Sequence, residues 1–146
     1  MVLALVATVV AVVALVAATS RSSGSSPAPT TATPTYSAAQ VSAAHQKLCD
    51  AYKLAAHAVQ IDTNGDNPAF AGIATVNAAL MLEQAVSTSP GLSSGDRAAA
   101  LALAAAYSHA QATASLVQAR DDPSWRSASD EVNTKDAEVK KVCGIG

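Results

Sequence analysis

Residues 46–56 read QKLCDAYKLAA and place a cysteine inside a helical pattern. Apolar side chains on either side of it recur every three or four residues, which is the spacing of a helix with one buried face. The stripe consists of Val41, His45, Leu48, Tyr52, Ala55 and Val59. The chain contains one other cysteine, Cys143. How these two thiols are used therefore bears on how the first and last parts of the fold are joined.

Capping signals divide residues 36–146 into four helices. Ser37 with Gln40 forms a capping box. Asn67, Ser93 and Asp122 mark three further helix starts, and proline follows Asn67 and Asp122. The predicted helices begin at Ser37, cover about 68–87 and about 94–120, and run from Asp122 to Cys143. No alternating apolar pattern indicates a strand. Short loops between four helices predict an all-α domain, a four-helix up-down-up-down bundle.

The second predicted helix, 68–87, carries large apolar side chains around most of its circumference. They are Phe70, Ile73, Val76, Leu80, Met81, Leu82 and Val86. This distribution predicts a largely buried helix. Half of all residues are apolar but only 3% are aromatic, so the core is expected to consist mainly of alanine and to be thin.

Residues 1–19 form an uncharged apolar segment long enough to span nearly all of a bilayer. Two alternatives stay open, a retained transmembrane anchor and a signal peptide cleaved near Ala18. Residues 20–35 are rich in Ser, Thr and Pro, which predicts a disordered linker. Alanines along residues 1–19 recur every three or four positions, so the segment is also a candidate for self-association. The domain from residue 36 onward is expected on the extracytoplasmic side, or secreted if cleavage occurs.

The cysteines admit three uses: a disulfide, two free thiols, or a zinc site completed by His45. In an up-down bundle the first and fourth helices are antiparallel neighbours, which brings Cys49 and Cys143 near each other without fixing them at the same level. An exported protein with two cysteines favours the disulfide over the other uses. We therefore predict a Cys49–Cys143 bond, no metal and no cofactor.

Two motifs resemble reactive or binding sites but lack their context. GLSSG, residues 91–95, matches the nucleophile elbow of hydrolases, yet no strand precedes Ser93 and no histidine follows the acid, so Ser93 is interpreted as a helix cap. DTNGDN, residues 62–67, begins like a calcium loop but lacks the glycine and the closing glutamate. Acidic side chains outnumber basic ones, eleven to nine, which argues against nucleic acid as a partner. The chain is therefore not expected to be an enzyme.

A pocket between the helices is the remaining candidate binding site. Its expected residues are His45, Tyr52, Phe70, Met81 and Tyr107. The predicted function is a structural or protein-interaction module of the cell envelope, with an unknown envelope protein as partner. The alternative is a carrier that holds an apolar ligand in this pocket.

Three stretches of the domain resemble known proteins: KLCDAYKLA, TNGDNPAFAGIATVNAALML and VKKVCG. They are similar to small alanine-rich membrane or exported proteins of actinobacteria. The resemblance covers most of residues 36–146 and implies an envelope location. It brings no catalytic residue with it.

Overall fold

The computed structural model describes residues 34–145, so the predicted apolar segment 1–19 and most of the linker 20–35 lie outside the described residues. Residues 34–145 contain four helices and no strand, which confirms the all-α prediction. The helices are α2 (Ala38–Thr63), α3 (Pro68–Ser87), α4 (Ser94–Ala114) and α5 (Pro123–Val142).

Each helix starts at the cap that its sequence predicts. The Gln40 amide N–H donates to the Ser37 hydroxyl, and the Gln40 side chain accepts from the Ser37 N–H at 2.8 Å, which completes the capping box. The other three N-caps accept in the same way from a backbone N–H two or three residues later: Asn67, Ser93 and Asp122. These bonds satisfy N–H groups that the helix itself leaves unpaired.

One helix boundary differs from its prediction. The third predicted helix was expected to extend to about residue 120, but α4 ends at Ala114. Ser115 is its C-cap, and the Ser115 hydroxyl donates to the carbonyl of Gln111 at 3.1 Å. Serine competes for the helix carbonyls in this way and so favours a helix end.

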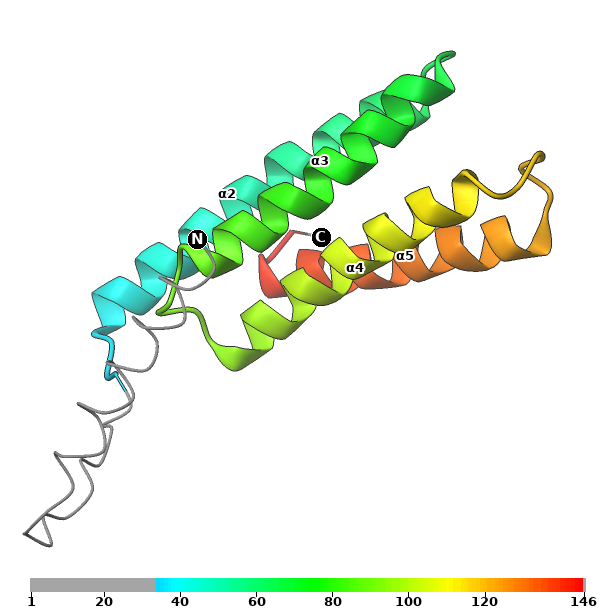
Figure 1. Cartoon of the computed structure of the whole chain (residues 1–146). Helices are drawn as coiled ribbons and strands as arrows, with labels where there is room; N and C mark the ends of the chain where they lie inside the picture. Colours follow the sequence, from blue (N-terminus) through cyan, green and yellow to red (C-terminus); the bar gives the residue numbers. More distant parts are fainter. Residues whose placement is uncertain (1–33, 146) are drawn as a thin grey trace, which may run out of the picture. The chain divides into compact units, whose positions relative to one another are not determined.

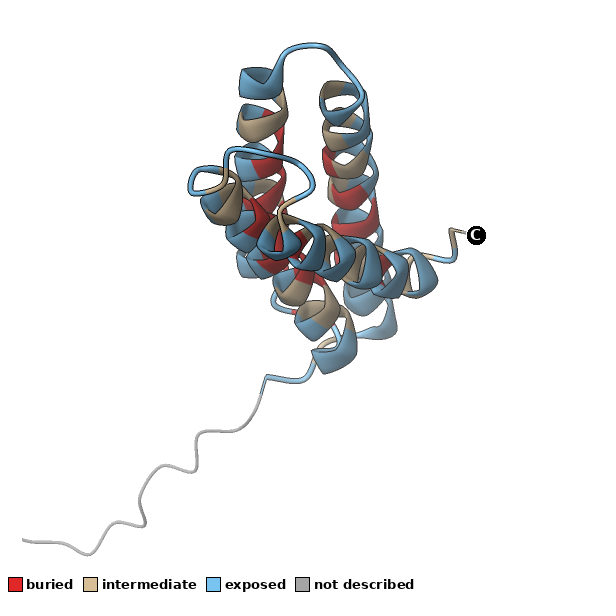
Figure 2. Ribbon diagram, turned by 90° about the vertical axis from the view of Figure 1, so that its right-hand side faces the viewer, coloured by how far each residue is buried: buried red, intermediate tan, exposed pale blue. Residues whose placement is uncertain are grey.

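The four helices form two hairpins, α2 with α3 and α4 with α5 (Figure 1). Residues 88–93 join the hairpins at one end, and each helix packs along the next one in the chain. Figure 1 shows the hairpins diverging away from this connection. Buried residues lie on the sides of the helices that face one another (Figure 2). α2 and α5, which are not consecutive, are joined through side chains.

Alanine makes up more than half of the buried apolar residues that the structure describes. Larger side chains are fully enclosed at a few positions: Leu48, Tyr52, Leu82, Leu103 and Val139. Alanine side chains let helices approach closely, but each one contributes little buried area. The core is therefore as thin as the composition predicts.

The prediction that helix 68–87 is largely buried is wrong. Four of its large apolar side chains are between 42% and 57% exposed: Phe70, Ile73, Val76 and Leu80. The buried side of α3 consists mostly of small residues, Ala74, Thr75, Ala78, Ala79 and Ala85, together with Leu82 and Val86. Ile73, Val76 and Leu80 lie on the opposite side, because they fall about half a helical turn from the small-residue seam. The alanines contact the neighbouring helices and leave the larger side chains outside.

Candidate functional site

Cys49 and Cys143 form a disulfide with their Cα atoms 5.5 Å apart, which confirms the predicted pairing. Cys143 is the C-cap of α5, and Gly144 follows it with φ +63°, a left-handed conformation that favours glycine. The turn brings Ile145 back against the core. Because the two sulfurs are bonded to each other, neither is free to serve as the thiolate ligand that a zinc site would need.

The connection between the two hairpins determines which turn of α2 lies beside the end of α5, and so where the two cysteines meet. The Lys47 ammonium donates to the Thr88 hydroxyl at the end of α3, and His45 contacts Asp96 in the first turn of α4. α4 therefore begins beside the second turn of α2, not beside its first turn. The antiparallel partner α5 ends at the same level, next to Cys49.

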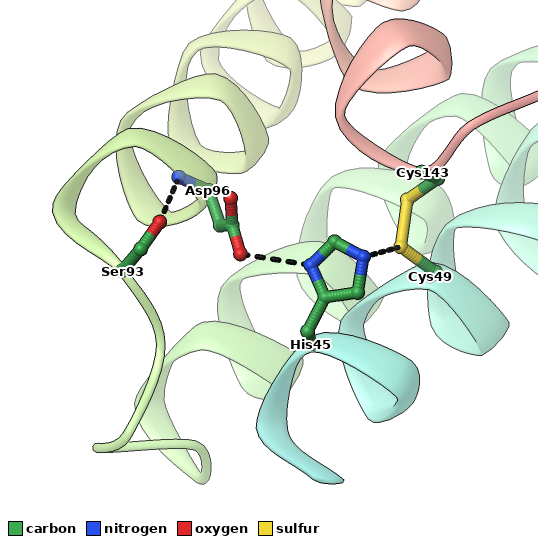
Figure 3. A network of polar contacts seen from close by, with 5 residues as sticks. All are labelled: His45, Cys49, Ser93, Asp96 and Cys143. Carbon is green, nitrogen blue, oxygen red and sulfur yellow. Dashed lines mark hydrogen bonds and ion pairs between the residues drawn. A yellow bond between two sulfur atoms is a disulfide. The ribbon is translucent and has the colours of Figure 1, made fainter. Parts of the chain in front are cut away.

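His45 links the disulfide to α4 (Figure 3). Its Nδ1 lies 2.9 Å from Asp96 Oδ2, and its Nε2 lies 3.7 Å from the Sγ of Cys49. A carboxylate accepts only, so Nδ1 carries the proton of this bond. The side chain of His45 is 39% exposed and that of Asp96 is 19% exposed, so solvent reaches the imidazole. The Ser93 hydroxyl accepts from the Asp96 N–H at 3.0 Å, which confirms Ser93 as a helix cap.

Tyr52 and Tyr107 lie together in a second polar cluster, between α2, α4 and α5. The Tyr52 hydroxyl donates to Asp136 Oδ1 at 2.7 Å, and the other oxygen of Asp136 is 2.8 Å from the Lys140 ammonium. Burial raises the pKa of Tyr107 to about 12, with a smaller contribution from the negative charge of Asp136. Burial, together with the hydrogen bond to Asp136, raises the pKa of Tyr52 still further.

The other predicted pocket residues lie elsewhere. Phe70 is 56% exposed near the start of α3, Met81 packs against the core, and His45 lies at the disulfide. A cavity of about 420 Å³ is lined by Tyr52 and Tyr107, but its wall also contains charged and polar groups, namely Lys53, His57, Asp136 and Lys140. The structure therefore brings together two of the five residues.

Two acidic residues that the sequence reasoning did not single out complete these clusters. Asp96 lies three residues after Ser93, a spacing that indicates only a helix-capping pair, and it also binds His45 from α4. Asp136 forms an (i, i+4) pair with Lys140, a spacing that is common on solvated helix faces, and its second partner is 84 residues away. In the sequence, the (i, i+4) spacing to Lys140 is the signal available for Asp136. That spacing predicts an ion pair on the surface, not the contact with Tyr52.

A cleft of about 340 Å³ lies where the hairpins diverge. Gly72 of α3 and Gln111 of α4 line it, together with Arg120 from the α4–α5 loop and Trp125 from the first turn of α5. A Cβ at Gly72 would lie 3.0 Å from the Gln111 amide, so glycine leaves the space that this side chain occupies. No sequence pattern predicted this cleft.

Large apolar side chains gather on the outside of the first hairpin. Lys47, Leu54 and Ile61 are seven residues apart and lie on one stripe of α2, which borders α3 because Lys47 binds Thr88. We call the following set the α2–α3 outer face: Leu54, Ile61, Phe70, Ile73, Val76 and Leu80, each at least 42% exposed. Among the described helices, α3 alone is long and apolar enough to cross a membrane, a test that core helices also pass.

Because of Tyr52 and Tyr107, we expect the domain to lose stability at alkaline pH. Their pKa values are raised in the folded protein, so the stabilisation is complete below the unfolded pKa of about 10 and is lost as the pH rises above it. We expect the free energy of unfolding to fall by about 1–3 kcal/mol between pH ~9 and ~11. Urea unfolding across this range measures the effect. A Tyr52→Phe/Tyr107→Phe variant should show a flatter pH dependence, and an unchanged slope would contradict the assignment.

No family model matches the chain, and no curated protein or solved structure is significantly similar to it.

Proposed function

We propose that the chain is an up-down-up-down four-helix bundle, held outside the cytoplasmic membrane by residues 1–19, that acts without catalysis as a structural and protein-interaction module. The α2–α3 outer face is the observation that carries this proposal. The disulfide and the apolar character of α3 support a membrane or exported location, since disulfides persist in oxidising compartments. Cleavage near Ala18 would instead release the same module.

The size of the outer face favours association. Six large apolar side chains that are about half exposed amount to roughly 500 Å², given the area that burial of each such side chain removes from water. The largest apolar patch on an ordinary monomer is about 300–600 Å², and patches of that size are often functional. Glu83 is the one charged residue of α3, so little charge would be desolvated when the helix is covered.

A second copy of the chain is the partner that we propose for this face. Two such faces related by a twofold axis would bury about 1,000 Å² in total, near the lower limit for a specific interface. The predicted linker of 16 residues corresponds to an r.m.s. reach of roughly 20–25 Å. Confinement of two such domains to one membrane would raise their effective concentration. A weak interface is then sufficient to form dimers at the membrane.

Charged substitutions on the outer face should abolish dimers without unfolding the domain. In an Ile73→Glu/Leu80→Glu variant, two carboxylates would be desolvated at the interface, while both positions are 57% exposed in the monomer. We expect the full-length protein in detergent to give dimers by native mass spectrometry, and the variant to give at least tenfold fewer. Its melting temperature should stay within a few degrees of the parent protein.

Leu116→Glu provides the matched control. Leu116 is 85% exposed but lies just beyond α4, in the second hairpin and outside the α2–α3 outer face, so its replacement should leave the dimer fraction unchanged. Both variants keep residues 1–19, which separates the outer face from any association through the anchor. Equal dimer fractions in both variants and the parent would refute this interface.

The distal cleft supports the carrier as a second candidate function. Its volume of about 340 Å³ lies within the range of small-molecule sites, and Val117, Ala114 and Trp125 supply apolar wall. The same native mass spectra test it, because a retained ligand adds a fixed mass to the monomer. A Trp125→Ala variant should lose that increment if the ligand occupies this cleft.

A further inference from the structure

A histidine held by a carboxylate lies against the disulfide. His45 contacts the Cys49 sulfur through one ring nitrogen and Asp96 through the other. We propose that the Cys49–Cys143 bond is a thiol–disulfide exchange site, in which an incoming thiolate attacks Cys143 and Cys49 leaves beside His45. This activity is independent of the outer face and of dimerisation.

The two sulfurs lie in different surroundings. Cys49 is buried, with 6% of its surface exposed, whereas Cys143 is partly exposed at the end of α5. An incoming thiol therefore reaches Cys143 more readily. The C-terminus of a helix carries partial negative charge, which disfavours a thiolate at Cys143. Of the nearby lysines, Lys140 is paired with Asp136 and Lys141 is exposed. Burial disfavours a thiolate at Cys49 as well, so the contact with His45 is what makes Cys49 the better leaving group.

Asp96 fixes the orientation of the imidazole. Because Nδ1 donates to the carboxylate, the ring cannot turn without losing a 2.9 Å bond, and Nε2 stays directed at Cys49. A proton on Nε2 can then pair with the thiolate that forms at Cys49. In the reduced protein, Cys49, His45 and Asp96 have the order of nucleophile, base and orienting carboxylate that activates cysteine in other proteins.

The exchange consumes a dithiol and balances in two steps. A thiolate of the dithiol forms a bond to Cys143 Sγ, the bond between the cysteines breaks, and the electron pair leaves on Cys49 Sγ. The second thiolate of the dithiol then attacks the dithiol sulfur that is bonded to Cys143. A disulfide forms within the dithiol, and Cys143 leaves as a thiolate. The dithiol is oxidised to a disulfide, and the protein gains two electrons and, after protonation, two thiols. The co-reactant class is a protein or small-molecule dithiol.

The expected effect of His45 on the rate has a definite sign. A proton at His45 Nε2 pairs with the departing Cys49 thiolate, and a stabilised thiolate leaves faster. Loss of the histidine should therefore slow reduction of the disulfide. If His45 served only as a structural link between α2 and α4, its loss would loosen the site and leave reduction unchanged or faster.

Reduction kinetics of the full-length protein in detergent test the proposal. Dithiothreitol serves as the dithiol, and alkylation at timed intervals followed by intact mass measurement counts the free thiols. We expect His45→Gln to slow reduction about three- to tenfold at neutral pH, and Asp96→Asn to slow it by a smaller factor. Rates equal to or above that of the parent protein in both variants would overturn the proposal.

His109→Gln is the matched control. His109 forms a comparable pair with Glu131 at 3.0 Å, but the structure gives it no sulfur contact. Its replacement removes a histidine–carboxylate bond and should change the rate less than twofold. A slowing equal to that of His45→Gln would assign the effect to general charge, against the proposal.

The position of attack can be determined independently. A brief reaction of the parent protein with glutathione, quenched in acid and mapped by peptide mass, should place the mixed disulfide on Cys143. An adduct mainly on Cys49 would contradict the proposed direction of exchange. This measurement needs no variant and so does not depend on whether His45→Gln folds.

Discussion

Replacing both cysteines in a Cys49→Ala/Cys143→Ala variant is expected to lower the free energy of unfolding by about 4–5 kcal/mol. The bond joins residues 94 apart, so it removes a large loop-closure entropy from the unfolded chain. Domains of this kind have only about 5–15 kcal/mol of stability in total. The bond therefore contributes a large share of the stability, and its loss should lower the melting temperature strongly.

The disulfide matters more because α2 and α5 have few other contacts with each other. Among the described residues, α2 and α5 are otherwise linked by the Tyr52–Asp136 hydrogen bond and by core packing, without the extensive backbone proximity of consecutive helices. Without the covalent bond, the end of α5 should separate from α2 first. Hydrogen exchange should show this as faster exchange at residues 136–145 than in the rest of α5.

Urea unfolding of the parent and variant measures the difference. Alanine is preferred to serine because Cys49 is buried and a hydroxyl there would need a partner. The single variants Cys49→Ala and Cys143→Ala serve as controls, because each loses the same bond and should lose similar stability. A loss below about 1 kcal/mol would show that packing, and not the disulfide, holds the hairpins together.

Truncation of Leu103 is expected to cost about 2–5 kcal/mol. Leu103 is fully buried in α4, which packs against both α3 and α5. Its helix supplies alanines at 100, 104 and 106, whose side chains are too short to fill a cavity. The space left by Leu103→Ala should therefore remain open, which places the loss toward the upper end of the range.

Leu101→Ala is the control for this prediction. Leu101 lies two residues away on the same helix and is 41% exposed, so its truncation should cost less than about 1 kcal/mol. Both substitutions replace leucine by alanine in α4, so helix propensity cancels in the comparison. Equal losses at 101 and 103 would mean that the core does not depend on its few large side chains.

Local sequence signals determined the helix starts. Ser37 with Gln40, and later Asn67, Ser93 and Asp122, act within two or three residues, so no distant part of the chain is needed to recognise them. The cysteine pairing was also predictable, because two cysteines in a chain predicted to be exported favour one disulfide. The end of α4 was less predictable, since residues 116–120, LVQAR, contain no glycine or proline to mark the helix end at the serine before them.

Composition and caps thus determined an all-α domain over the described residues with a thin alanine core, and the two cysteines indicated the cross-link between α2 and α5. Only the tertiary structure decided which side of α3 is buried, which acids meet His45 and Tyr52, and where the hairpins diverge. The reason is that alanine allows helices to approach on almost any face. The choice of face then depends on how all four helices pack together, which no short stretch of sequence specifies.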